Sequence, residues 1–308
     1  MAGLRAHQTE AVDAAVHALG SVPSAGAGLR STIVSACGTG KTFMGVHTAL
    51  RVARTGRVLV LVPTLDLLVQ TFAAWREAGR AGTMVAVYSL HTDAELAAAG
   101  VRCTTNARRL LEWAGGAARV TAFATYASLP VLAEAHRAGL RRWDLVVDEA
   151  HRTSGPWGKP WAAVHDDAVL PAGRRLYLTA APRVADPWTA AGDGHDEAEN
   201  EPTLVASMDD EQVFGPVVYR LSLAEAIARG LLARYQIIVL EIRDQALSGG
   251  IPSKERSETE VAAAQLEALT TAVFKAAATH QLDRVMTFHH RVADARALAQ
   301  AVTSDRGD

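Results

Sequence analysis

The stretch that decides the fold lies near the amino terminus and reads Ser35-Ala36-Cys37-Gly38-Thr39-Gly40-Lys41-Thr42. It follows an apolar run, residues 31–34, and it precedes a helical pattern that begins near Phe43. A strand that turns through glycines into a helix points several backbone N–H groups into one concavity, where a polyphosphate binds. The stretch therefore predicts a phosphate-binding loop between a strand and a helix.

The residue types in this loop predict how a nucleotide would be bound. Lys41 is expected to reach the β- and γ-phosphates, and the Thr42 hydroxyl is expected to hold Mg²⁺. The expected nucleotide contacts in the loop are Cys37, Gly38, Thr39, Gly40, Lys41 and Thr42. The usual pattern has a glycine where this chain has Ser35. The alternative is a glycine-rich turn that contains a lysine by chance.

Length, composition and charge limit the class of protein. The 308 residues predict about two domains, and 49% apolar residues are ample for buried cores. The net charge of −2 excludes a global basic field, so a nucleic acid would have to bind in a local groove. Cys37 and Cys103 are the only cysteines, too few for a disulfide framework or a zinc cluster. No apolar run approaches the roughly 18 residues of a membrane helix, so we expect a cytoplasmic protein.

Strands and helices alternate along the first part of the chain. Buried strands are predicted at 58–62, 84–88, 120–125, 143–147 and 175–179, and helices at 4–19, 65–72, 94–99, 108–113 and 128–138. This alternation predicts an α/β fold with a doubly wound parallel sheet. Ligands gather at the carboxyl ends of the strands in such sheets. Pro63 and Thr64, which follow one of these strands, are therefore expected on the same edge as the phosphate-binding loop.

Two adjacent carboxylates follow the apolar strand at 143–147, in the sequence Asp148-Glu149-Ala150-His151. Carboxylates at the end of a buried strand are costly unless a cation meets them. Mg²⁺ on a nucleotide is such a cation. Asp148 would hold it, and Glu149 would orient and deprotonate the water that attacks the γ-phosphate. The alternative is an acidic helix N-terminus that the helix dipole favours.

A glutamine near the amino terminus is a candidate for base recognition. Gln8 lies three residues after Arg5 on the helix predicted at 4–19, on adjoining positions of one face. Its amide presents one donor and one acceptor, which can pair with the edge of adenine. The alternative is a solvated surface glutamine.

Together, Gly-Thr-Gly-Lys-Thr at 38–42 and Asp-Glu-Ala-His at 148–151 resemble the ATPase core of superfamily 2 helicases, the DEAD/DEAH class. The branch that it resembles most includes the motor subunits of type I and III restriction enzymes. Leu4-Arg5-Ala6-His7-Gln8 resembles the adenine-reading element of this branch, with Ala6 in place of a proline. Leu178-Thr179-Ala180-Ala181-Pro182-Arg183 resembles motif III, with Ala181 in place of a threonine.

The resemblance implies further roles. ATP and Mg²⁺ would be the ligands of an RecA-like P-loop NTPase domain, and His151 and Thr179 would couple hydrolysis to movement. Pro63-Thr64-Leu65 and Thr125-Tyr126-Ala127-Ser128 resemble motifs Ia and Ib, which touch the nucleic-acid backbone in this family. The implied nucleic-acid contacts are Pro63, Thr64, Thr125 and Tyr126, and the family favours DNA over RNA as the partner.

The predicted domains are a helicase ATP-binding RecA-like domain at 1–232 and the beginning of a second, incomplete RecA-like domain at 233–308. A strand at 235–242, helices at 258–280 and 292–302, and a motif IV-like stretch at 284–290 make up the second part. His289 and His290 are interpreted as polar residues at a strand end rather than metal ligands. The acidic segment 193–201 is expected to be a loop.

The family's second domain supplies motifs V and VI, including an arginine finger, and nothing in this chain matches them. Such a finger contributes roughly 10³ to 10⁵ in rate, so we expect ATP binding with slow hydrolysis.

Two functions from different classes follow from these observations. The first is an ATP-dependent nucleic-acid helicase or translocase core. The second is a nucleotide-binding interaction module in a larger complex, or a remnant of a helicase, without motor activity of its own. An unrelated P-loop kinase or GTPase would have no use for Asp-Glu-Ala-His. Motifs V and VI beyond residue 308 would favour the motor.

Overall fold

The computed structural model describes residues 3–20, 28–54, 56–88, 94–185, 205–235, 258–282, 285–289 and 291–304. The chain divides into two compact units, Met1–Arg234 and Tyr235–Asp308, and each is described by itself. No helix in these ranges is long and apolar enough to cross a membrane.

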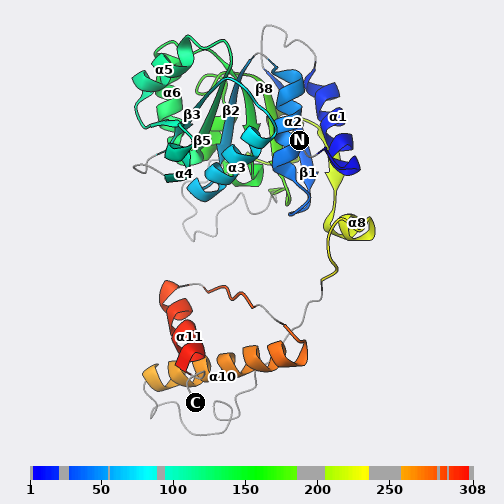
Figure 1. The fold of residues 1–308 in the computed structure, drawn as a ribbon, viewed down its shortest axis with the longest axis vertical. Helices are drawn as coiled ribbons and strands as arrows, with labels where there is room; N and C mark the ends of the chain where they lie inside the picture. Colours follow the sequence, from blue (N-terminus) through cyan, green and yellow to red (C-terminus); the bar gives the residue numbers. More distant parts are fainter. Residues whose placement is uncertain are drawn as a thin grey trace, which may run out of the picture. The chain divides into compact units, whose positions relative to one another are not determined.

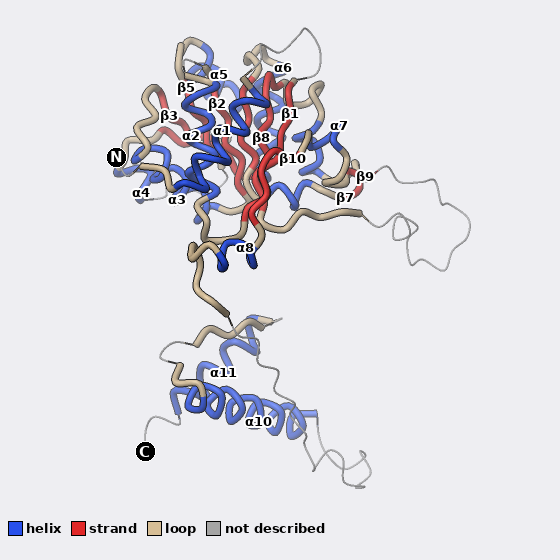
Figure 2. Tube along the Cα trace, turned by 90° about the vertical axis from the view of Figure 1, so that its right-hand side faces the viewer, coloured by secondary structure: helices blue, strands red, loops and turns tan. Residues whose placement is uncertain are grey.

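An eight-stranded sheet, whose paired strands all run parallel, forms the centre of the first unit. The strand order is β10-β1-β8-β6-β2-β5-β3-β4, and Figure 2 shows these strands in red, side by side. The bounds are β1 (Leu29–Ser35), β2 (Arg57–Val62), β3 (Thr83–Val87), β4 (Arg102–Thr104), β5 (Val120–Thr125), β6 (Trp143–Val147), β8 (Ala172–Thr179) and β10 (Val217–Leu221). The predicted α/β fold with a parallel sheet is confirmed.

Helices cover both faces of this sheet (Figure 1). The bounds are α1 (Ala6–Leu19), α2 (Lys41–Val52), α3 (Leu65–Glu77), α4 (Ala94–Ala98), α5 (Ala107–Gly115), α6 (Leu129–Arg137), α7 (Glu211–Phe214) and α8 (Leu223–Ala228). Three 3₁₀ helices are η1 (Tyr126–Ser128), η2 (Ala150–Thr153) and η3 (Pro160–His165).

The central strand β2 explains why the sheet needs two helical layers. Its six residues are all buried. Leu59 and Leu61 pack in one core with α5 and α6, whereas Val58, Val60 and Val62 pack in another with α1, α2 and α3. Successive side chains of a strand point to opposite faces, so a continuous apolar run requires cover on both sides.

Some short elements were not predicted. The strand β4 has three residues, and β7 (Gly155–Pro156) pairs antiparallel with β9 (Val205–Ala206) over two residues each. Such lengths are too short for periodicity to detect. The segments 193–201 and 236–242 lie outside the described residues.

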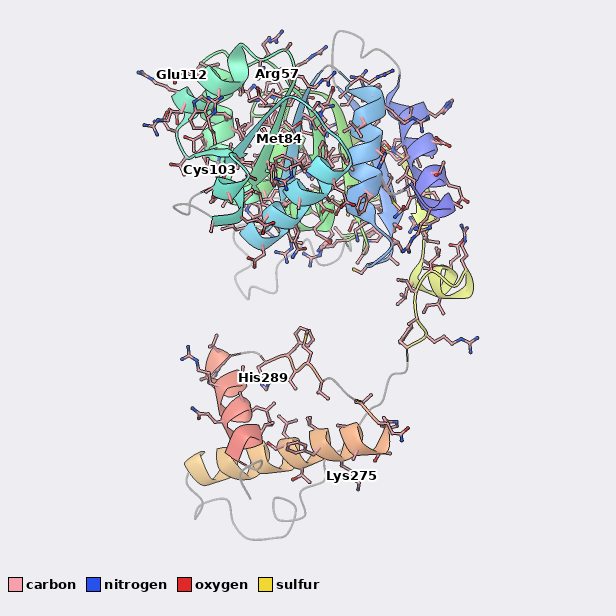
Figure 3. All side chains as sticks on the ribbon, in the orientation of Figure 1. Arg57, Met84, Cys103, Glu112, Lys275 and His289 are labelled. Atoms are coloured by element: carbon pink, nitrogen blue, oxygen red, sulfur yellow. The ribbon has the colours of Figure 1, made fainter. Side chains whose placement is uncertain are left out.

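The second unit contains α10 (Glu258–Thr279) and α11 (Val292–Ser304), close to the two predicted helices. The strand-end interpretation of His289, which is labelled in Figure 3, is wrong because 285–289 form no strand. Burial would have to stabilise a strand there, but Met286 and Phe288 are 79% and 89% exposed. His290 lies outside the described residues. The assignment of the second unit to the beginning of a second RecA-like domain stays a prediction.

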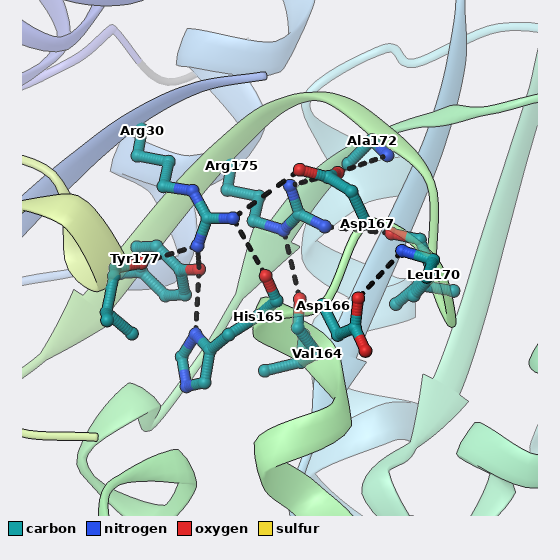
Figure 4. A network of polar contacts seen from close by, with 11 residues as sticks. Arg30, Val164, His165, Asp166, Asp167, Leu170, Ala172, Arg175 and Tyr177 are labelled. Carbon is teal, nitrogen blue, oxygen red and sulfur yellow. Dashed lines mark hydrogen bonds and ion pairs between the residues drawn. The ribbon is translucent and has the colours of Figure 1, made fainter. Parts of the chain in front are cut away.

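A buried polar network attaches η3 to the sheet (Figure 4). Arg175 of β8 is fully buried, forms an ion pair with Asp167 at 2.8 Å, and donates Nε–H to the Val164 carbonyl at 2.9 Å. Arg30 of β1 donates Nη2–H to the His165 carbonyl at 2.8 Å. The His165 ring lies 3.0 Å from the Tyr177 hydroxyl through Nδ1. These contacts anchor the connection that leads from β6 to β8.

Burial gives the network a pH dependence. Removal from water lowers the pKa of His165 from 6.5 to about 3, so below pH 6.5 the unfolded chain binds a proton that the folded protein does not. We expect this residue to lower the free energy of unfolding by about 1.4 kcal/mol for each pH unit below 6.5. Denaturant titrations between pH 6.5 and 4.5 measure this slope. A His165→Gln protein should lose that part of the slope, while a variant of the exposed His17, His17→Gln, should keep it. Equal slopes in all three proteins would contradict the assignment.

Candidate nucleotide site

The loop between β1 and α2 has the backbone that its glycines predict. Gly38 and Gly40 have φ values of 80° and 88°, in the left-handed region that favours glycine. A Cβ atom on Gly40 would lie 2.3 Å from Gln8 Nε2, so a larger residue would displace the Gln8 amide as well as strain the backbone. The helix α2 begins at Lys41, and the N–H groups of its first turn have no partner within the helix. The loop can therefore present N–H groups to an anion.

The departure at Ser35 is accommodated inside the loop. Ser35 is fully buried, and its hydroxyl lies 2.7 Å from Thr39 Oγ1. Thr39 in turn donates to the Ala36 carbonyl at 2.6 Å. These hydroxyl contacts tie the start of the loop to its middle.

Two side chains in the first turn of α1 contact the backbone of the loop between β1 and α2. The Thr39 carbonyl accepts a hydrogen bond from Gln8 Nε2 at 3.1 Å, and it lies 2.9 Å from His7 Nε2. Gln8 Oε1 accepts from the Arg5 backbone N–H at 2.9 Å. Gln8 is only 8% exposed, so a solvated surface role is excluded. No pattern predicts the contact of His7, because Thr39 lies 32 residues away along the chain.

A cavity of about 270 Å³ opens beside this contact. Its lining residues are Gly3, Leu4, Arg5, Gln8, Gly38, Thr39, Gly40 and Phe43. The Gln8 amide has two N–H groups and two lone pairs on its oxygen, and the contacts above use one of each. One donor and one acceptor therefore remain on a residue that lines the cavity.

The acidic pair lies at the carboxyl end of β6. Asp148 is 7% exposed, and its backbone N–H donates to the Leu61 carbonyl at 2.9 Å. Glu149 has a φ of 51°, which is uncommon for a residue with a side chain, and its N–H donates to Asp148 Oδ1 at 3.0 Å. The next element is a single 3₁₀ turn, and the Glu149 side chain does not cap it. The alternative of an acidic residue pair at an α-helix N-terminus is therefore wrong.

The charge on Asp148 is incompletely compensated. Burial, and after it the Glu149 carboxylate, raise the pKa of Asp148 from 3.8 to a net value of about 6. The N–H of Glu149 and the Lys41 ammonium lower the pKa without cancelling these effects. Lys41 itself is 9% exposed. A further cation at this position would stabilise the carboxylate.

The strand order brings the predicted residues to one edge of the sheet. The strands β1 and β6 both neighbour β8 and run parallel to it, so their carboxyl ends lie about 10 Å apart. Thr179, the last residue of β8, lies between them.

His151 links the acidic pair to β8. Its Nδ1 lies 3.1 Å from Thr179 Oγ1 and 3.4 Å from Glu149 Oε2. Burial lowers the pKa of His151, and the Glu149 charge opposes that effect. The predicted coupling residues are therefore in contact with each other and with the predicted base.

The residues expected to touch nucleic acid differ in their exposure to solvent. Thr64 follows β2, is exposed, and caps α3 by accepting from the Leu67 N–H at 3.4 Å, while Pro63 is half-buried. Tyr126 is 1% exposed, and its hydroxyl donates to the Asp148 carbonyl at 2.6 Å. This placement corrects the expectation for the Tyr126 side chain, because it supports the acidic pair from inside the protein.

Thr125 is also buried, and its hydroxyl lies 3.1 Å from that of Ser128. Its side chain is likewise used within the fold. For Thr125 and Tyr126, only backbone atoms would remain for a contact with nucleic acid.

No group of three or more His, Cys, Asp or Glu side chains in the described ranges could hold a metal ion. A metal at this edge would depend on few protein ligands, with Asp148 and the Thr42 hydroxyl as the candidates. Mg²⁺ is usually bound in this way, through one or two carboxylates together with substrate phosphates.

The parallel sheet with a lysine-bearing loop after β1 and an acidic pair after β6 defines a helicase-like P-loop NTPase domain. Residues 2–184 match the family model described as the res subunit of type III restriction enzymes, and the chain belongs to that family. No curated protein matches the chain.

Two solved structures of Type ISP restriction-modification enzymes are similar to this chain. The enzyme LlaBIII bound to DNA is 25% identical, with a TM-score of 0.59 over 76% of this chain and 16% of its own. A nuclease-deletion mutant of LlaGI in complex with a DNA substrate mimic is 26% identical, with a TM-score of 0.57 over 75% of this chain and 21% of its own. The chain thus spans less than a quarter of either enzyme's length.

The raised pKa of Asp148 leads to a prediction about the stability of the metal-free protein. Because the pKa is raised in the folded state, the free energy of unfolding should fall by about 3 kcal/mol as pH rises from 4 to above 6. An Asp148→Asn protein lacks this penalty and should be the more stable of the two at pH 8. The exposed Glu112 of α5 provides the control, since Glu112→Gln should leave stability unchanged. Denaturant titrations in the presence of a chelator measure the difference, and a less stable Asp148→Asn protein at pH 8 would contradict the prediction.

Proposed function

We propose that this chain is the ATP-binding part of a DNA helicase or translocase and that it hydrolyses ATP with Mg²⁺. The observation that carries the proposal is the position of Lys41 and Asp148, two buried and oppositely charged residues, after β1 and β6 at one sheet edge. The positive φ values of Gly38 and Gly40 support the proposal, because a loop that turns through such glycines can direct its N–H groups toward a phosphate.

The loop residues bind the phosphates in this proposal. The N–H groups at the start of α2 and the Lys41 ammonium would meet the phosphate oxygens. The Thr42 hydroxyl and Asp148 would hold Mg²⁺. When bound, Mg²⁺ neutralises charge on the phosphates. The raised pKa of Asp148 supports this role, because burial and the Glu149 carboxylate disfavour a charge that a bound cation would stabilise.

Glu149 is the proposed general base. Its left-handed backbone turns the chain sharply after β6, and its carboxylate lies 3.4 Å from His151 Nδ1. That contact would hold the carboxylate in position to accept a proton from the attacking water. Because His151 also contacts Thr179, a movement of β8 would change the position of the base.

Arg5 and Gln8 are the proposed adenine contacts. Both line the 270 Å³ cavity beside the phosphate loop, and Gln8 retains a donor and an acceptor for the base. Binding of the base to Gln8 would also affect the phosphate-binding loop, because Gln8 donates a hydrogen bond to the Thr39 carbonyl.

DNA is the proposed polymer, since both similar enzymes have structures in complex with DNA or a DNA mimic. Thr64 is the exposed side chain at the carboxyl edge that would contact its backbone. The neighbouring Pro63, and the backbone of Thr125 and Tyr126, would complete the contact. Binding through phosphates should weaken as salt concentration rises.

The nucleotide site is tested by substitution of its lysine. Lys41→Ala should abolish the rise in melting temperature that Mg-ATP causes, which corresponds to about 2.7 kcal/mol at a ligand concentration of 100 Kd. Lys159→Ala, which removes an exposed lysine, should keep the full shift. Glu149→Gln should also keep the shift but lower ATP turnover roughly 10²-fold or more. An unchanged shift in the Lys41→Ala protein would remove the assignment of the loop.

Base recognition is tested at Gln8. Gln8→Ala should bind ATP and GTP with nearly equal affinity, because a pair of hydrogen bonds to the adenine edge is lost. Titration calorimetry with each nucleotide measures the ratio of the two Kd values. Gln8→Glu keeps the size of the side chain but removes its donor, and it should lose selectivity in the same way. A Gln8→Ala protein as selective as the parent would return Gln8 to a purely structural role.

A further inference from the structure

A second cavity, of about 380 Å³, lies at the opposite edge of the sheet, where the strands begin. Its lining includes Arg57 and Trp143, the first residues of β2 and β6, and Arg174 near the start of β8. Arg141 and Arg142, just before β6, complete its basic wall. Figure 3 labels Arg57 at this edge. The volume is within the range of ligand pockets, roughly 300–1,000 Å³.

The charge in this amino-edge pocket is strongly positive. Among the described residues that line it, four are arginines and Asp144 alone is acidic. Arg174 Nη1 forms an ion pair with Asp144 Oδ1 at 3.2 Å. Arg142 also attracts the Asp144 carboxylate at longer range, but Arg57, Arg141 and Arg142 form no ion pair with it. The pocket is therefore suited to an anion.

Arg57 provides the strongest evidence that the pocket is built for a ligand. It is 7% exposed, and its Nη1 donates to the Ala114 carbonyl. Its Nε and Nη2 are buried without a hydrogen-bond partner, as is Trp143 Nε1. The guanidinium lies over the Trp143 ring, 4.7 Å from the ring centroid. Buried donors without acceptors cost about 1–3 kcal/mol each, and the described chain supplies no acceptor for these three.

Helix capping accounts for only part of this arrangement. Helices that connect parallel strands end at the amino edge, where their carbonyl groups attract cations. Arg174 Nε donates to the Leu19 carbonyl at the end of α1 at 2.7 Å, and Arg57 Nη1 bonds to Ala114 in the last turn of α5. Capping does not use the remaining donors of Arg57. Nor does it explain the exposed Arg141 and Arg142, which form no hydrogen bond or ion pair with the rest of the described chain.

We propose that the amino-edge pocket binds a phosphate group. A phosphate has acceptors on several sides, and planar guanidinium groups match them two at a time. The phosphate belongs either to a small phosphorylated molecule or to a nucleic-acid backbone. The six-residue strand β2 places the pocket about 20 Å from the carboxyl edge, so it is separate from the nucleotide site. The proposal does not depend on ATP hydrolysis.

The test uses the full chain with Lys41→Ala as background, so that the loop near residue 41 does not bind the probes. Inorganic pyrophosphate and a single-stranded oligothymidylate are the two probes, read by melting temperature and by fluorescence anisotropy. Arg141→Ala/Arg142→Ala removes two exposed guanidinium groups without disturbing the core. The control Arg108→Ala/Arg109→Ala removes two exposed arginines of α5 outside the pocket.

For a small phosphorylated ligand, we expect the pocket variant to bind pyrophosphate about tenfold more weakly than the control, with oligothymidylate binding unchanged. A comparable loss of oligothymidylate binding, with or without a loss of pyrophosphate binding, would identify a nucleic-acid backbone as the source of the phosphate. The proposal is overturned if the pocket variant and the control bind both probes equally well.

Discussion

The attraction between Lys41 and Asp148 is the interaction on which the proposed site depends. Both side chains are more than nine-tenths buried, so both have lost most of their hydration. Lys41 lowers the pKa of Asp148, yet burial and the neighbouring Glu149 still hold that pKa near 6. A protein that needed only stability would avoid a buried carboxylate with so little compensation. The site therefore has the charge balance expected of a pocket that binds a metal and a phosphate chain together.

The strand order produces this arrangement. Because β8 lies between β1 and β6, Lys41 at the start of α2 and Asp148 after β6 lie at one edge of the sheet with Thr179 between them. The contact between His151 and Thr179 joins the acidic pair to the strand in the middle. The buried network around Arg175 fixes the connection from β6 to β8 at a distance from the edge. Thr179, beside the proposed nucleotide site, and Arg175, in the buried network, thus lie at different positions along β8.

Much of this could be predicted from the sequence because it is local. The apolar run of β2 and the glycines at 38 and 40 each determine their own conformation through steric and burial constraints. The roles of His7, Tyr126 and Arg57 could not be predicted in this way. Arg57 bonds to a carbonyl 57 residues away, and Tyr126 to one 22 residues away. Such contacts depend on how the folded chain packs, and the periodicity of apolar residues in the sequence does not predict them.

Hydrogen–deuterium exchange on the full chain, with and without Mg-ATP, tests most directly whether one ligand is bound by both loops. If both loops bind one ligand, Mg-ATP slows exchange in two peptides at once, one covering residues 36–44 and one covering residues 146–152. Lys41→Ala should remove the protection from both peptides. Protection of one peptide without the other, or protection that survives in the Lys41→Ala protein, would contradict the account.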